Sequence, residues 1–416
     1  MRFQWWVTSL ALTLAAFVLY WLNSQGSTAG QLTDALFVVS LLALIPLARV
    51  NGGLVESLAK GSNSIFSGLL KACLDNVPEI AIGAFLLLQA VRRPTLQTEN
   101  YTIVHGLLLG SVIENILFTL GVATLVGTLW HGKLKFSREK AAGFASMLGL
   151  AVVGMALPTL ATSFAEKGAS TPQTEEFVSL VVSVILIISY VAYILVEFFH
   201  VGEKGGKSEE GEEGKAGEEK AEGVEQGARY VAASAQPVEM VEPALSAKEA
   251  ETPRSTRATV GLIVLTVISI GAIAGVCATL VTVTDRVISY SLLTPLSFGL
   301  IVLPIITNFG ELLDAVGSAF HGQMGAAMEV AAGSSVQVPL FVTPALIFIG
   351  AVFAWLTPGL PPITLIFQSL GLVTLGLAAF VYALVNLDGE TTWLEGAQLI
   401  AFYTMIAVTA FALPGV

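Results

Sequence analysis

Two segments of this 416-residue chain place an asparagine and a glutamate three residues apart inside long apolar stretches. Asn76 and Glu79 lie in LDNVPEIAIG, and Asn308 and Glu311 lie in ITNFGELLDAVG. Residues at this spacing share one face of a helix, so each motif presents an amide and a carboxylate together. A proline or a glycine inside each motif weakens the helix and frees backbone carbonyl oxygens. Such oxygen ligands suit Ca²⁺, and Mn²⁺ or Mg²⁺ less well.

A second polar block follows each motif in the next apolar segment. Ser111 and Glu114 stand in GSVIE, and Ser334 and Gln337 stand in GSSVQ, with three residues from the GS serine to the polar side chain both times. The two blocks recur in the same order in the two halves of the chain, which predicts an internal repeat.

The composition indicates an integral membrane protein. Of all residues 54% are hydrophobic, 12% are charged, and the mean hydropathy is +0.78, values that suit a surface facing hydrocarbon. Stretches of roughly 20 apolar residues can cross a bilayer as helices, and their length argues against the short strands of a membrane barrel. We expect eleven such helices, at 5–22, 33–50, 66–91, 101–128, 141–164, 176–199, 258–284, 290–319, 325–356, 362–386 and 393–414.

The elements are expected to form four parts. Residues 1–30 form a first transmembrane helix, retained rather than cleaved as a signal peptide; residues 31–201 and 258–416 each form five helices. An odd number of helices inverts the second set relative to the first, as in secondary transporters with a site where the repeats meet. Residues 202–257, with 13 Glu and 8 Lys or Arg, read as an acidic, disordered linker, either a tether or a regulatory, cation-attracting tail.

The basic residues predict the orientation. The connections on the side of the N-terminus and the linker hold most of the Lys and Arg, which places that side in the cytoplasm and the C-terminus in a lumen or outside the cell. Vacuolar or other organellar membranes and the plasma membrane all stay open. Cys73 and Cys277 fall inside expected helices, so they indicate buried thiols rather than a disulfide or zinc site.

A carboxylate inside a bilayer is costly, so it faces a partner or a water-lined cavity. Serine and amide side chains, in contrast, often serve as hydrogen bonds between membrane helices. That structural role is the alternative for Ser111, Ser335 and Asn115. It is a weaker alternative for Glu79 and Glu311, because a repeated carboxylate is far costlier to bury.

The two Asn and Glu motifs, the run AAGSSVQVPLFVTPALIFIG, the text ALIPLARV and the acidic central loop resemble the Ca²⁺/H⁺ (cation/proton) exchangers of the Ca²⁺/cation antiporter superfamily. This resemblance implies one extra helix and two inverted five-helix repeats, with Glu79 and Glu311 binding the cation and protons in turn. Supporting positions that match are Asn76, Asn308, Ser335 and Gln337, to which our comparison of the halves adds Ser111 and Glu114 as candidate binding residues.

Several residues depart from that family's usual pattern. Asp75 and Thr307 replace glycines, Leu312 replaces a histidine, and Glu114 replaces a serine. Asp75, Asp314 and Glu329 are candidate relay or cavity acids, and interhelical pairing is an equal alternative for Asp314. A change in the ligand set leaves a Na⁺/H⁺, K⁺/H⁺ or Mn²⁺/H⁺ exchanger open beside Ca²⁺/H⁺ exchange.

The expected mechanism is alternating access, in which Ca²⁺ and protons compete for the two glutamates. HExxH, P-loop and GxSxG patterns do not occur in the sequence, so we expect neither an enzyme nor a cofactor. The expected partners are the transported ions and the lipid bilayer, with no nucleic acid, and the oligomeric state stays open. A cation channel, or a membrane protein that senses cations without moving them, are the rival classes.

Overall fold

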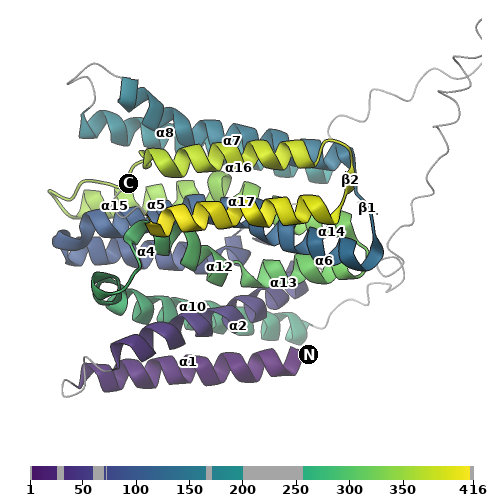
Figure 1. Ribbon diagram of the computed structural model, residues 1–416. Helices are drawn as coiled ribbons and strands as arrows, with labels where there is room; N and C mark the ends of the chain where they lie inside the picture. The colour runs from purple at the N-terminus through teal and green to yellow at the C-terminus, as the bar shows by residue number, and fades with distance from the viewer. Residues whose placement is uncertain are drawn as a thin grey trace, which may run out of the picture.

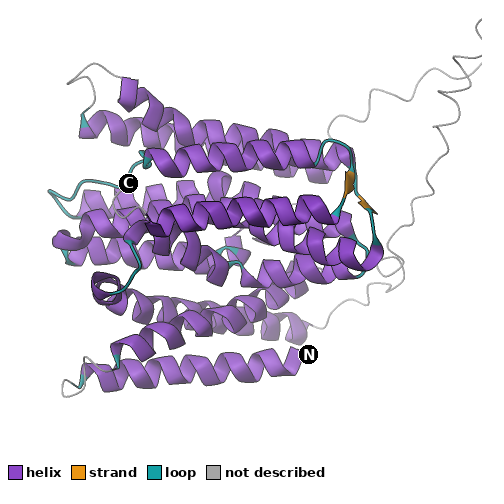
Figure 2. Cartoon of the chain, in the orientation of Figure 1, coloured by secondary structure: helices purple, strands orange, loops and turns teal. Residues whose placement is uncertain are grey.

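The computed structural model describes residues 2–25, 32–59, 70–71, 73–164, 171–199 and 256–412. The chain is a bundle of roughly parallel and antiparallel helices with loops at its two ends (Figures 1 and 2). Residues 202–255 of the predicted linker lie outside the described residues. Cys277 is buried, as predicted, whereas Cys73 is only partly buried, and both are free thiols.

Helices occupy parts of all eleven predicted segments, but residues 291–294 and 362–368, which were predicted to be helical, lie in loops. In the first half they are α1 (Arg2–Ser24), α2 (Thr33–Ala59), α4 (Val77–Arg92), α5 (Gln97–Ile113), α6 (Leu120–His131), α7 (Arg138–Phe164) and α8 (Pro172–Phe199). A 3₁₀ turn, η1 (Pro94–Leu96), precedes α5, and a π-helical segment, η2 (Glu114–Thr119), joins α5 to α6.

The second half contains α10 (Thr256–Tyr290), α11 (Pro295–Ser297), α12 (Leu303–Thr307), α13 (Phe309–Phe320), α14 (Met324–Gln337), α15 (Thr343–Leu356), α16 (Ser369–Val385) and α17 (Trp393–Ala412). Two further π-helical segments, η4 (Phe298–Val302) and η5 (Val338–Val342), join α11 to α12 and α14 to α15.

Eight spans among the described residues are long and apolar enough to cross a membrane, and the bent pair 295–307 and 309–320 gives a ninth. The shorter helices α4 and α16, of 16 and 17 residues, fill the two remaining predicted segments. The fold is therefore an all-helical polytopic membrane protein that accommodates eleven crossings.

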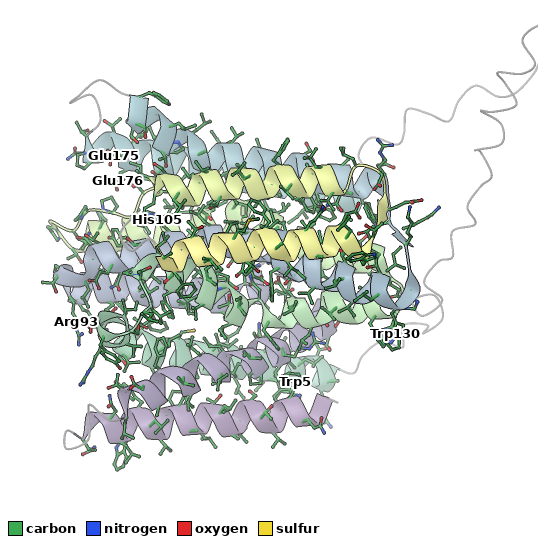
Figure 3. All side chains as sticks on the ribbon, viewed as in Figure 1. Trp5, Arg93, His105, Trp130, Glu175 and Glu176 are labelled. Atoms are coloured by element: carbon green, nitrogen blue, oxygen red, sulfur yellow. The ribbon has the colours of Figure 1, made fainter. Side chains whose placement is uncertain are left out.

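The two halves run through the bundle in opposite directions. α2 runs from the left end of the view to the right end, whereas α10 runs from right to left, and the two helices pack side by side (Figure 1). The start of α1 and the end of α17 lie at opposite ends. Trp5 and Trp130 lie at the end where α1 starts, and Arg93, Glu175 and Glu176 lie at the other (Figure 3).

The outside of the bundle stays apolar while the centre is tightly packed. Large apolar side chains such as those of Leu157, Ile188 and Ile268 are exposed on α7, α8 and α10, as expected for helices facing lipid. α5 is the most enclosed element, with Leu107 and Leu108 fully buried. It therefore forms the central support for the polar site.

One element was absent from the prediction. β1 (Leu134–Lys135) pairs antiparallel with β2 (Glu390–Thr391) at the end where α1 starts. Lys133 and Lys135 lie 3.5 and 3.3 Å from carboxylate oxygens of Glu390. This short sheet links the loop after α6 to the loop before α17.

Candidate cation and proton site

Both Asn and Glu motifs lie at breaks in the helices. Asn76 separates the helical residues 73–75 from α4, and Asn308 separates α12 from α13, which meet at 55°. Their backbone angles are nearly equal, with φ −88° and ψ 17° at Asn76 and φ −91° and ψ 7° at Asn308. Each glutamate therefore stands in the first turn of the helix that follows the break.

The sequence explains both breaks. Pro78 sits at the start of α4, where its missing N–H costs no helical hydrogen bond, and it disfavours helix in the residue before it. Gly310 stands at the corresponding point of α13 and carries no side chain. A helix start also leaves backbone N–H groups unpaired, and their dipole favours a carboxylate nearby.

The second polar blocks also occupy matching places. The α-helix changes to a π-helix at Glu114 in the first half and directly after Gln337 in the second. A π-helical turn inserts an extra residue and re-aims the side chains beside it. The serine-to-polar blocks thus end where each helix changes its pitch.

Hydrogen bonds cross between the two halves at these matched positions. Asn76 Nδ2 donates to Gln337 Oε1 at 2.9 Å, and Asn308 Nδ2 donates to Glu114 Oε2 at 3.1 Å. Each motif asparagine is therefore held by the second polar block of the opposite half. Because the amide nitrogen makes this bond, the amide oxygen points away from it.

The two motif glutamates lie together inside this frame. Glu79 is 2% exposed, and its side chain lies beside that of Thr307, while the side chain of Glu311 lies beside that of Ser334. The two carboxylates are close enough to interact electrostatically with each other. Oε2 of each is buried and has no hydrogen-bond partner among the described residues.

Glu114 differs from these two acids. It is 1% exposed, and both of its oxygens have donors, because Thr119 Oγ1 donates to Oε1 at 2.6 Å and Asn308 donates to Oε2. Ser111 is fully buried nearby in sequence, and its hydroxyl has no partner among the described residues. Each oxygen of Glu114 thus has a donor, whereas Oε2 of Glu79 and Oε2 of Glu311 have none among the described residues.

The two serines of the GSSVQ block differ from the prediction, which named Ser335 as a supporting residue of the site. Ser335 Oγ donates to the carbonyl of Ala331 in its own helix at 2.7 Å. Its neighbour Ser334 lies beside the side chain of Glu311. The sequence GSSVQ contains two adjacent serines, whose side chains point about 100° apart on a helix. The sequence alone therefore does not indicate which hydroxyl lies beside the carboxylate.

The three candidate relay or cavity acids lie in different surroundings. Asp75 is partly buried beside the site and interacts electrostatically with Lys71 and Glu79. Asp314 forms an ion pair with Arg49, and half-exposed Glu329 forms one with Lys140. Glu329 therefore lies outside the buried group of carboxylates.

Sequence reasoning missed Thr119, Ser334 and Arg49. Thr119 is a small residue within an apolar segment, and its sequence position does not indicate a role. The π-helical turn places its hydroxyl within hydrogen-bond distance of the Glu114 carboxylate. Arg49 carried a signal, because an arginine ten residues before the end of an apolar helix needs a partner.

The described residues contain no group of three or more His, Cys, Asp or Glu side chains arranged for a metal ion. The candidate donor set instead combines the two carboxylates with amide, hydroxyl and backbone oxygens. Such mixed oxygen sets suit Ca²⁺, which takes six to eight ligands in flexible geometry.

Comparison with known proteins assigns the chain to a family. The family model described as "Sodium/calcium exchanger protein" matches residues 34–199 and 261–412. The chain belongs to this family. The two matched ranges correspond to the two halves and leave out α1 and the region of the acidic linker.

Relatives in this family include two cyanobacterial proteins. The Ca²⁺/H⁺ antiporter of Aphanothece halophytica is 28% identical over 388 residues, which cover 91% of each chain. The Ca²⁺/H⁺ antiporter of Synechocystis sp. is 29% identical over 400 residues, 96% of this chain and 95% of that protein. A vacuolar calcium ion transporter of Schizosaccharomyces pombe is 35% identical, but the match spans 31% of its length.

Solved structures show the same fold. YfkE superimposes with a TM-score of 0.70 at 23% identity, over 97% of this chain and all of that one. The H⁺/Ca²⁺ exchanger CAX superimposes with a TM-score of 0.62 at 14% identity, over 99% of this chain and 91% of that one. The family member described here is thus an integral membrane protein with the architecture of these exchangers.

Proposed function

We propose that this protein exchanges Ca²⁺ for H⁺ across a membrane by alternating access, with Glu79 and Glu311 binding the cation and protons in turn. The observation that carries the proposal is a pair of neighbouring glutamates, each with a buried carboxylate oxygen that has no partner among the described residues. Family membership and the two cyanobacterial antiporters support the same choice of ions.

The coupling follows from electrostatics. Two neighbouring carboxylates inside a protein at membrane depth are costly to keep ionised together. Either a divalent cation or two protons removes that cost, and both use the same oxygens, so binding one expels the other. The loaded and protonated forms are both near neutral, and each can reorient without the other ligand.

The supporting residues position the ligands. Gln337 and Glu114 hold the amides of Asn76 and Asn308, so that the two amide oxygens face away from these anchors. The helix breaks free backbone carbonyls beside each glutamate. In this proposal Ser111 and Ser334 supply hydroxyls, Asp75 is a cavity acid, and the end with Trp130 and the start of α1 faces the cytoplasm.

The test uses the purified protein in sealed vesicles under an imposed proton gradient. Ca²⁺ uptake and luminal pH are recorded together for the wild type, Glu79→Gln and Glu311→Gln. We expect Ca²⁺ entry coupled to proton exit, and a loss on the order of 100-fold in each variant, because a ligating carboxylate is lost. Glu99→Gln, which changes an exposed acid at the start of α5, is the matched control and keeps the wild-type rate.

The other outcomes are distinct. Proton exit driven by Na⁺ or K⁺ but not by Ca²⁺ contradicts the assigned ion, and stronger competition by Mn²⁺ than by Ca²⁺ does the same. Ca²⁺ flux that ignores the proton gradient indicates a channel. Full coupled exchange in Glu79→Gln contradicts the assigned site.

A further inference from the structure

An arginine in the middle of α2 contacts the motif helix of the opposite half. Arg49 Nη1 donates to the carbonyl oxygen of Gly310 at 3.3 Å and forms an ion pair with Oδ2 of Asp314. Gly310 directly precedes Glu311, and Asp314 lies one helical turn after it. Arg49 Nη1 therefore contacts the turn that carries Glu311 at two places, one residue before this glutamate and three residues after it.

The backbones of the two helices are also close at this point. A Cβ placed on Gly310 would lie 3.8 Å from both the N and the Cα atom of Arg49. The absence of a side chain at Gly310 thus lets the first turn of α13 pack against α2. The Arg49 guanidinium adds polar contacts at the same place. Arg49 holds the turn where the chain bends by 55° after α12.

The contact lies within both helices rather than at their ends. Asp314 is six residues before the end of α13, and Arg49 is ten before the end of α2, so they lie about 9 and 15 Å from these ends at 1.5 Å per residue. Their side chains are nevertheless 51% and 31% exposed. Charged groups with this exposure are stable where water reaches them, so we infer that water reaches this contact beside Glu311.

The geometry points to Arg49 as a positioning residue for Glu311: by binding Gly310 and Asp314 it fixes the turn that carries this carboxylate for the cation. It also uses Asp314 as a structural partner and so keeps that acid out of the cation-binding set. This inference rests on the proposed function and extends it to a residue outside the two motifs.

The alternative role of Arg49 is purely electrostatic, and it predicts the opposite sign. A positive charge beside the site repels a divalent cation, so its removal would strengthen Ca²⁺ binding. Positioning predicts weaker binding after removal, because the carboxylate loses its fixed turn.

The experiment measures Ca²⁺ binding to the purified protein by calorimetry and Ca²⁺-dependent proton exit from vesicles. For Arg49→Gln we expect the dissociation constant and the half-saturating Ca²⁺ concentration to rise about tenfold, because bonds from a charged donor are lost. The maximal rate stays within about twofold of the wild type. Arg49→Lys, whose ammonium offers three donors, recovers most of the affinity.

A double variant and a matched control separate the two roles. Arg49→Gln with Asp314→Asn removes both charges but still lacks the positioning bond, so its affinity stays as weak as that of Arg49→Gln. Lys140→Gln breaks the ion pair with Glu329 between α7 and α14 and keeps wild-type affinity. Equal thermal stability of the variants excludes misfolding.

Two results would overturn the inference: tighter or unchanged Ca²⁺ binding in Arg49→Gln, or wild-type affinity in the double variant. Failure of the proposed function looks different. In that case the wild type itself shows neither Ca²⁺ binding that depends on Glu79 nor Ca²⁺-driven proton exit.

Discussion

At the residue scale, the two halves of the site differ mainly at one matched position, which is Glu114 in the first half and Gln337 in the second. The two side chains occupy matching positions and do the same work, since each accepts a hydrogen bond from a motif asparagine of the other half. Glu114 adds a second donor, Thr119. A carboxylate with both oxygens occupied by donors is better suited to anchor Asn308 than to exchange ligands.

Glu114→Gln is therefore expected to retain coupled exchange. A glutamine can accept from Asn308 through its oxygen and donate to the Thr119 hydroxyl through its nitrogen, which makes the two halves more alike. Glu114→Ala leaves the Asn308 amide without its acceptor and weakens Ca²⁺ affinity about tenfold. Both variants are compared with Glu79→Gln in the same vesicle assay. A Glu114→Gln protein as inactive as Glu79→Gln would make Glu114 a ligand or proton carrier instead.

Sequence reasoning identified residues at this scale where a repeat supported them. Glu79, Glu311, Asn76, Asn308 and Gln337 recur in phase, and the structure brings them together across the two halves. Thr119 and Arg49 have no repeated partner in the sequence. Their contacts depend on a π-helical turn and on the approach of α2 to α13, which apolar periodicity does not encode.

At the element scale, the long apolar runs predicted the spans to within a few residues in most cases. The predicted 101–128 and 325–356 segments are continuous helices in the structure, but π-helical turns interrupt both. Such turns leave the hydrophobic pattern nearly unchanged, so the sequence did not reveal them. Within the predicted 66–91 segment, Asn76 separates the helical residues 73–75 from α4, which begins at Val77.

The central helix α5 packs its glycines against η4. A Cβ on Gly110 would lie 2.2 Å from the carbonyl oxygen of Leu300, and one on Gly106 would lie 2.9 Å from the backbone nitrogen of Leu300. Glycines four residues apart let two membrane helices approach closely. This contact places the block ending at Glu114 beside the segment that leads to Asn308.

Gly110→Ala is expected to destabilise the protein by about 2 kcal/mol, because the methyl group meets backbone atoms that cannot turn away. Ca²⁺ affinity falls with it, since η4 and α12 are displaced beside the site. Gly149→Ala is the control, as a Cβ there meets no atom within 4 Å. Thermal unfolding in detergent and calorimetric Ca²⁺ binding measure both effects. Equal stability of Gly110→Ala and Gly149→Ala would show that the helices can separate without cost.

At the scale of the whole molecule, two halves that run in opposite directions bring Glu79 and Glu311 together. The two equivalent breaks and the crossed asparagine contacts give each half matching parts, as the proposed alternating access requires. If the proposed exchanger moves one Ca²⁺ for two protons, the two ligand loads carry the same charge. The proposed cycle then moves no net charge across the membrane.

This balance predicts how exchange responds to pH and to voltage. Protons compete for the same oxygens, so the half-saturating Ca²⁺ concentration rises as pH falls, with a limiting slope of about two in log concentration per pH unit if two protons leave per cation. An imposed membrane potential leaves the initial rate unchanged, because electroneutral exchange moves no net charge. Each net charge moved across the membrane would add about 2.3 kcal/mol per 100 mV. Initial Ca²⁺ uptake is measured across a pH series, and at fixed pH with potentials set by a K⁺ gradient and valinomycin.

A limiting slope near three with voltage-dependent uptake would assign a third exchangeable proton, with Glu114 and Asp75 as the acids able to carry it. Glu114→Gln would then return the slope to two if Glu114 were the carrier.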